Sequence, residues 1–189
     1  MNHKTVVERI SELVEYTCKQ PTNIYGYTMW THHIITVKKF ALMLADRFNA
    51  NKDVVELSAL LHDYAAVKNE KFVEQHHIIG ASLAGEILSN LSYPEDKIKD
   101  IQLCIESHRA SVPYEIKTPE ALCVASADGM THIDQLPSLF FAVYTKRNFD
   151  VDDGKVWIRE KLKRTWGKMC KEAQDIMQKK YLCALKVLE

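Results

Sequence analysis

Apolar residues recur every three to four positions along almost the whole chain, and this period constrains the fold more than any other feature. A repeat of this length places apolar side chains on one face of an α-helix. The two-residue alternation that would indicate a β-strand is not sustained anywhere in the sequence. Of the 189 residues, 47% are hydrophobic and 26% are charged, an ordinary balance for a globular protein with a core. The sequence therefore predicts an all-α protein.

The apolar period also divides the chain into expected helices and connecting segments. No repeat, low-complexity segment or interdomain linker is visible, so we expect residues 1–189 to form one compact helical domain. The stretch 54–61 is apolar almost all round, which indicates a buried helix. The last helix is expected to be long, because its period continues from Leu162 to Leu185. Other helices are expected around residues 6–14, 31–48, 80–91, 94–105 and 121–128 and after Pro137. Loops are expected at 20–30, 64–75 and 110–118, with a polar turn at 150–154.

Charge and cysteine content exclude several classes of partner. The 25 Lys and Arg residues balance 25 Asp and Glu residues, so no overall basic field is present to hold nucleic acid or an anionic membrane. Any anionic substrate must be held by local charge or by metal. The N-terminus lacks the apolar core of a signal peptide, and no run of about 18 apolar residues indicates a transmembrane span. The five cysteines are scattered without a Cys-x-x-Cys pair, which favours reduced thiols and a cytoplasmic location.

Histidine and aspartate residues lie on or beside the core faces of several expected helices. His62 and Asp63 end the buried apolar stretch, and Asp128 continues the apolar face of its own helix. His33 and His108 each stand one turn from an apolar position on two further helices. A buried carboxylate without a partner is costly. A hydrogen bond or a helix cap would satisfy any one of these residues alone. Together they are better explained by a shared cation that neutralises the carboxylates and binds imidazole nitrogens.

The order of these residues on an all-helical chain resembles the HD-domain superfamily of metal-dependent phosphohydrolases. The resemblance covers roughly residues 30–140, and its central feature is the adjacent pair His62 and Asp63. The segments that carry it are HIITV from His33, ALLHDY around the doublet, HHIIGA from His76, SHR from Ser107 and ASAD ending at Asp128.

The resemblance implies a divalent-metal site. The ligands of a first ion would be His33, His62, Asp63 and Asp128. Members with two further histidines in the intervening helices bind a second ion, with the doublet aspartate bridging, and His76 and His108 match those positions. The alternative is a mononuclear site in which both histidines contact substrate phosphate. His77 competes with His76 as the ligand, although the spacing to Gly-Ala favours His76. Oxygen and nitrogen ligands suit iron, manganese, magnesium, zinc or nickel, and the spacing does not choose among them.

Several charged residues near these motifs are further candidates. Many family members carry a lysine three positions after the doublet aspartate, where this chain has Ala66; the nearest lysine is Lys68, either a substrate-binding residue or a solvated loop lysine. Arg109 either binds a substrate phosphate or forms a surface ion pair. His132 lies one helical turn after Asp128 and either supports the site or packs as a polar residue.

Two other groups have simpler interpretations. The aromatic residues Tyr25, Tyr27 and Trp30 precede His33 and either wall the mouth of the site or serve as packing anchors. The basic run 159–171 is expected to be the solvated side of the last helix.

The sequence therefore predicts a metal-dependent phosphohydrolase that acts on a nucleotide or another small phosphate ester. In this prediction Asp63 holds the metal and orients or deprotonates the attacking water, while Arg109 and Lys68 bind the substrate phosphate. Two alternatives share the ligand set: a dinuclear-iron oxygenase of the same fold, and a metal-binding regulatory module without turnover. Substrate specificity is expected to reside in the three predicted loops.

Overall fold

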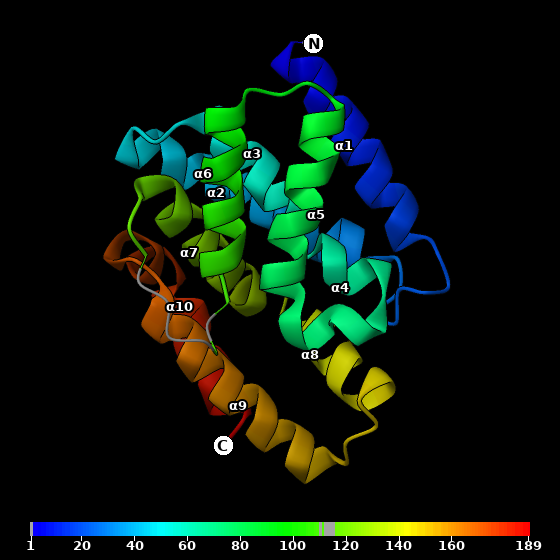
Figure 1. The fold of residues 1–189 in the computed structure, drawn as a ribbon. Coiled ribbons are helices and arrows are strands. Elements are labelled where there is room, and N and C mark those ends of the chain that lie inside the picture. Colours follow the sequence, from blue (N-terminus) through cyan, green and yellow to red (C-terminus); the bar gives the residue numbers. More distant parts are fainter. Residues whose placement is uncertain (1, 110, 112–115) are drawn as a thin grey trace.

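The computed structural model describes residues 2–109, 111 and 116–189 (Figure 1). These residues form helices and contain no strand, which confirms the all-α prediction. The α-helices are α1 (His3–Cys18), α2 (Ile35–Phe48), α3 (Lys52–Leu61), α4 (Tyr64–Lys68), α5 (His76–Asn90), α6 (Glu95–Ser107), α7 (Pro119–Asp134), α8 (Leu136–Phe141), α9 (Val151–Lys168) and α10 (Lys171–Val187). Two π-helical segments, η1 (Met29–Ile34) and η3 (Ala142–Lys146), and one 3-10 segment, η2 (Glu70–Gln75), complete the fold.

The core is built around α3, whose side chains are buried on almost every side, as its continuous apolar sequence predicts. Helices α2, α6, α7 and α1 pack against α3, while α2 also packs along α7 and α5 along α6. Leu57, Leu60 and Leu61 are completely buried. Burying one such side chain contributes roughly 1.5–3 kcal/mol. The end of α3, where the His62–Asp63 doublet follows, is therefore held rigidly in the middle of the molecule.

Side-chain caps set several helix starts. Asn2, Asn51 and Thr118 each accept a hydrogen bond from a backbone N–H in the first turn of α1, α3 and α7. Asp150 caps α9 in the same way through the N–H of Asp153. The predicted polar turn at 150–154 is therefore wrong, because α9 begins at Val151.

Two other expectations differ from the structure. Segment 64–75, expected to be a loop, contains the short helix α4 and the 3-10 segment η2, and four of the five residues of α4 are buried. The helix expected from about Thr31 is preceded by the π-helical turn η1, which continues directly into α2. Of the loop expected at 110–118, residues 110 and 112–115 lie outside the described residues.

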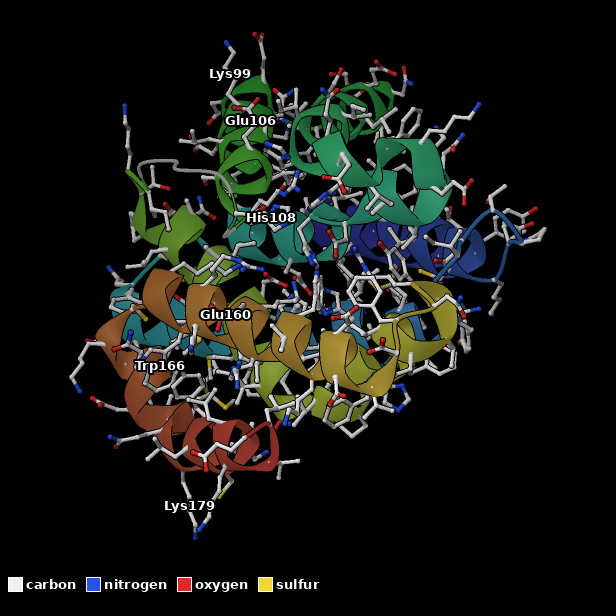
Figure 2. All side chains as sticks on the ribbon, turned by 90° about the horizontal axis from the view of Figure 1, so that it is seen from below. Lys99, Glu106, His108, Glu160, Trp166 and Lys179 are labelled. Carbon is white, nitrogen blue, oxygen red and sulfur yellow. The ribbon has the colours of Figure 1, made fainter. Side chains whose placement is uncertain are left out.

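The expected long C-terminal helix is instead two helices, α9 and α10, which lie together at one end of the molecule in orange and red (Figure 1). Met169 and Cys170 have extended backbone conformations and break the helix between them. The break is held because the Cys170 N–H donates to Ser126 Oγ of α7 at 3.0 Å. Trp166 stacks on Tyr181 with ring centroids 4.1 Å apart, and Figure 2 shows Trp166 between the two helices.

In the described part of the chain, no helix is both long and apolar enough to cross a membrane.

Candidate metal centre

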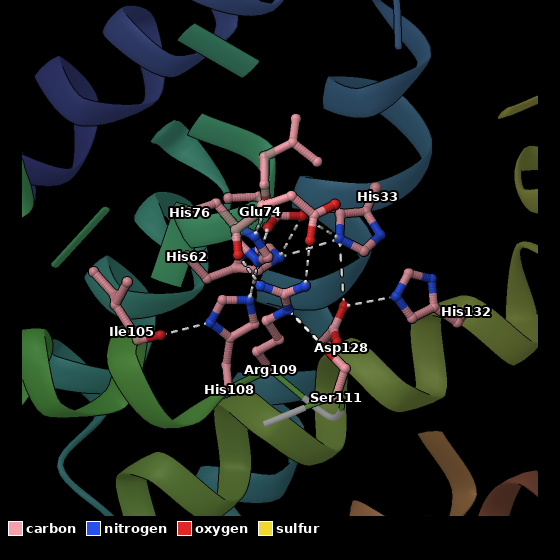
Figure 3. Close-up of polar contacts among 12 residues, drawn as sticks. His33, His62, Glu74, His76, Ile105, His108, Arg109, Ser111, Asp128 and His132 are labelled. Carbon is pink, nitrogen blue, oxygen red and sulfur yellow. Dashed lines mark hydrogen bonds and ion pairs between the residues drawn. The ribbon is translucent and has the colours of Figure 1, made fainter. Parts of the chain in front are cut away.

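Six side chains that the sequence singles out converge on one point of the structure (Figure 3). They are His33 of η1, His62 and Asp63 after α3, His76 at the start of α5, His108 after α6, and Asp128 of α7. Most stand at helix ends, where a side chain can reach beyond its own helix. The helix packing around α3 therefore assembles residues that are far apart in the sequence.

The first group comprises His33, His62 and Asp128, all buried, with one candidate ligand atom of each within 4.8 Å of the others. The Nε2 atoms of His33 and His62 are 3.1 Å apart. His33 Nε2 lies 3.4 Å from Asp128 Oδ1. Two imidazole nitrogens and a carboxylate oxygen in this arrangement are a ligand set that divalent metals accept.

The second group comprises Asp63, His76 and His108. The Nε2 atoms of His76 and His108 are 3.2 Å apart, and they lie 3.3 and 3.7 Å from Asp63 Oδ1. The other oxygen, Oδ2, faces the first group, 3.2 Å from His33 Nε2 and 3.4 Å from His62 Nε2. The carboxylate of Asp63 thus lies between the two groups, with one oxygen toward each.

Backbone carbonyls fix the rings of three of these histidines. The Nδ1 atoms of His62, His76 and His108 lie 2.8, 2.6 and 2.6 Å from the carbonyl oxygens of Ala59, Val73 and Ile105. A carbonyl only accepts, so Nδ1 carries the proton and the Nε2 lone pair of each neutral ring points into the centre. A carbonyl bonded to the outer nitrogen is the usual way in which proteins orient a metal-binding histidine.

In this geometry hydrogen-bond acceptors face one another without a donor between them. His76 Nε2 lies within hydrogen-bond distance of both His108 Nε2 and the Asp63 carboxylate, and none of these three groups has a proton to donate when the rings are neutral. Buried acceptors without a donor are costly, and a cation between them removes the cost. The donor set therefore fits a metal ion in each of the two His/Asp groups.

Electrostatics in the centre keep both carboxylates ionised. Burial opposes ionisation of Asp63, but His62, His108 and His33 hold its pKa well below the usual range. Burial acts in the same way on Asp128, and Lys168 with His132 holds the pKa of that carboxyl well below its usual range. Burial lowers the pKa of His108 to about 4, so this imidazole is neutral at pH 7. Ionised carboxylates and neutral imidazoles are the forms that bind metal.

His132 and Lys168 each contact a different oxygen of the Asp128 carboxylate. His132 Nε2 lies 3.2 Å from Asp128 Oδ1, and its ring stacks on His33 with centroids 5.1 Å apart. Lys168 Nζ donates to Asp128 Oδ2 at 2.5 Å and to the carbonyl of His108 at 2.8 Å. The role of Lys168 was missed by sequence reasoning because it lies forty residues beyond Asp128 in a helix expected to be solvated. Its only signal was its place in the basic run.

A cavity of about 370 Å³ opens over the centre. Tyr25 lines it, as expected for a wall of the site, whereas Tyr27 is exposed and donates a hydrogen bond to Glu15. Trp30 packs in the core. The expectation that the basic run is a solvated face is wrong for its inner side, since Lys161, Arg164 and Lys168 also line the cavity.

The two predicted substrate-binding residues are placed differently. Arg109 lines the cavity and is held there by Ser111 and Glu74: Nε donates to Ser111 Oγ at 2.7 Å and Nη2 to Glu74 Oε2 at 3.1 Å, while Nη1 donates to the Glu74 carbonyl. Lys68 is exposed, lies outside the cavity lining, and has its ammonium 5.7 Å from the ring centroid of Tyr64.

The structure also separates the two adjacent histidines at the start of α5. His76 joins the second group, whereas the buried His77 belongs to neither group and its Nδ1 has no hydrogen-bond partner among the described residues. Burial lowers the pKa of His77.

Comparison with known proteins gives one family and several related structures. Residues 30–132 match the model of the HD domain. YpgQ from Bacillus subtilis superposes with a TM-score of 0.74 at 18% identity, covering 100% of this chain and 94% of YpgQ. A structure of YpgQ in complex with ADP has a TM-score of 0.72 at 18% identity, covering 96% of this chain and 93% of that one. An HD-superfamily hydrolase from Bacillus thuringiensis superposes with a TM-score of 0.70 at 18% identity, covering 99% and 95%. No curated protein matches the chain.

Proposed function

Since the chain belongs to the HD-domain family, we propose that it is a metal-dependent phosphohydrolase acting on a nucleotide or another small phosphate ester. One observation carries this proposal. The carboxylate of Asp63 lies between two groups of buried histidine nitrogens, with one oxygen toward each, beside a cavity large enough for a small phosphorylated molecule. Fold alone would not assign a reaction, but a paired oxygen and nitrogen ligand set suits phosphoryl hydrolysis.

In this proposal Asp63 would be a ligand of both of two divalent ions. The ligands of the first would be His33, His62, Asp63 and Asp128, and those of the second Asp63, His76 and His108. Iron, manganese, magnesium, zinc and nickel all accept such ligands. Metal ions bound there would polarise phosphoryl oxygens and lower the pKa of a bound water.

The protein's own residues would then position the substrate and the charge around it. Arg109 would bind a phosphate oxygen. Its hydrogen bonds to Glu74 and Ser111 hold the guanidinium at the cavity wall, and they do not use all five of its N–H groups. Lys168 would hold the outer oxygen of Asp128 and so fix the other oxygen toward His33. His132 supports the same carboxylate from α7.

The proposal of a nucleotide rests on the relatives rather than on a base pocket. YpgQ, with the same fold, was crystallised with ADP. The cavity here has Tyr25 in its lining, an aromatic ring that suits contact with a planar base.

The test is phosphate release from nucleotides and simple phosphate esters by the protein loaded with each of the five metals. We expect hydrolysis with at least one metal and a loss of at least about 100-fold on Asp63→Ala, because one substitution removes a ligand from both groups. Lys68→Ala, outside the cavity, is the matched control and should retain the wild-type rate. Full activity in Asp63→Ala would contradict the proposal. Oxygen consumption by the iron-loaded protein without phosphate release would instead indicate that the protein is an oxygenase.

A further inference from the structure

Lys161 of α9 lines the cavity and forms no ion pair with a carboxylate of the described residues. Its ammonium lies 5.9 Å from the ring centroid of Trp157, and no hydrogen bond or ion pair joins it to any described residue. The side chain is half-buried, and burial lowers its pKa to about 8. A partly buried ammonium without an ion-pair partner in the described part of the chain is costly, so its position calls for a ligand.

Two arginines stand beside Lys161. The guanidinium carbon of Arg147, which follows η3, lies 4.8 Å from the centroid of the same Trp157 ring, so one indole carries two cations. Arg164 follows Lys161 by three positions on α9 and also lines the cavity. These three residues, Arg147, Lys161 and Arg164, are called the α9 cluster below.

Among the described residues, no carboxylate of the cavity is left to pair with the α9 cluster. The acidic residues of this part of the chain that line the cavity are Asp63, Glu74 and Asp128. Glu74 forms an ion pair with Arg109, and Asp128 forms one with Lys168. With divalent cations bound at Asp63 and Asp128, the centre would no longer attract the cluster, and its three positive charges would face the cavity without a counter-ion from the residues that the structure describes. Such a cluster binds an anion.

The cluster and the metal centre lie on different elements around one cavity. The metal groups come from η1 and α3 to α7, while the cluster comes from the end of η3 and from α9, beyond the family match at 30–132. Figure 2 shows α9 passing below His108. The hydrogen bond from Lys168, at the end of α9, to the His108 carbonyl connects α9 to the metal centre. A phosphate at the metals and Arg109 therefore leaves the cluster free for a second anionic group.

We propose that the α9 cluster is a second phosphate subsite, and hence that the substrate carries at least two linked phosphates. This inference rests on the proposed function in taking the first phosphate to lie at the metal centre. A single phosphate would engage the metals and Arg109 alone. A diphosphate or triphosphate would contact both the metal centre with Arg109 and the α9 cluster. The protein would therefore bind it more tightly than the corresponding monophosphate.

The test compares the binding of inorganic tripolyphosphate and inorganic phosphate to the metal-loaded protein by calorimetry. Lys161→Met should weaken tripolyphosphate about 10-fold or more, the usual loss for one charge-assisted contact, and should change phosphate affinity by less than about threefold. Lys163→Met is the matched control. Lys163 lies two positions away on α9, is 51% exposed, and pairs with Glu160 outside the cavity. Its substitution should leave both affinities within about twofold of wild type. Thermal unfolding of both variants verifies that each is folded.

Equal losses in the two variants would overturn the inference, and so would a Lys161→Met variant that weakens phosphate as much as tripolyphosphate. The result also separates this inference from the proposed function. Lys161-dependent binding without hydrolysis of any ester would leave the subsite standing and remove the phosphohydrolase proposal. Hydrolysis of a monophosphate without Lys161-dependent binding of tripolyphosphate would do the reverse.

Discussion

At the scale of single residues, the centre depends on which ring nitrogen carries the proton. His62, His76 and His108 each bond through Nδ1 to a backbone carbonyl and direct Nε2 inward. A backbone partner does not change with side-chain substitution elsewhere, so these orientations are set by the helix ends themselves. Removing one ring should therefore affect one metal group and leave the neighbouring rings in place.

The adjacent histidines of α5 provide a matched pair for this prediction. His76→Ala should reduce the bound metal by about one ion per chain and lower hydrolysis at least about 10-fold, because it removes a ligand of the second group. His77→Ala should keep the full metal content, since His77 belongs to neither group. Elemental analysis of both variants decides the question. No metal loss in His76→Ala would indicate that His76 binds substrate rather than metal, and equal metal loss in the two variants would contradict the assignment of His76 over His77 as the ligand.

Sequence reasoning could single out five of the six residues of the centre because each is a polar residue in or beside an apolar context, whereas His76 was identified from the family resemblance alone. His62 and Asp63 follow a buried stretch, and Asp128 continues an apolar face. Lys161 and Lys168 carried no such signal, because lysines on a helix rich in Lys and Arg look like an ordinary solvated face. Their position depends on how α9 packs, and the local pattern does not specify that.

At the scale of elements, the corner between α9 and α10 could not be predicted from the sequence, because the apolar period continues through it. The chain breaks there for a tertiary reason: Cys170 bonds to Ser126, and Met169 packs where Gly129 has no side chain. A Cβ added at Gly129 would lie 2.6 Å from Met169 Cγ and 2.8 Å from Met169 Sδ. This close approach brings Lys168 to Asp128.

Gly129→Ala should therefore push the corner away from α7. We expect a loss of about 1–3 kcal/mol in the free energy of unfolding, the usual cost of overpacking, together with weaker metal binding as Lys168 leaves Asp128. Gly167→Ala is the control, because a Cβ there would meet nothing within 4 Å. It should be neutral or slightly stabilising in a helix. Urea unfolding measures both, and equal stability of the two variants would contradict this view of the corner.

At the scale of the whole molecule, we propose that residues 1–189 form one domain, although the family match spans only 30–132. Helices α9 and α10 pack on α7, and α1 packs on α3 and α4. Ile158 and Leu162 of α9 and Ala173 of α10 are completely buried. The segment beyond the match also supplies Lys161, Arg164 and Lys168 to the cavity.

A fragment ending at residue 134 should therefore be unstable, because the face of α7 under α9 and α10 would be exposed to water. We expect no cooperative thermal transition in this fragment and little metal binding. A fragment that unfolds cooperatively and binds as much metal as the full chain would show that the C-terminal helices are not required for folding or for metal binding.

The central claim is that the clustered histidines and aspartates hold metal, and elemental analysis of the purified protein beside Asp63→Ala tests it most directly. We predict about two divalent ions per chain in the wild type, with most of this metal lost in the variant, because Asp63 faces both groups. A wild-type protein that binds no metal, with thermal stability unchanged when metals are added, would contradict the claim and make the cluster a purely structural network.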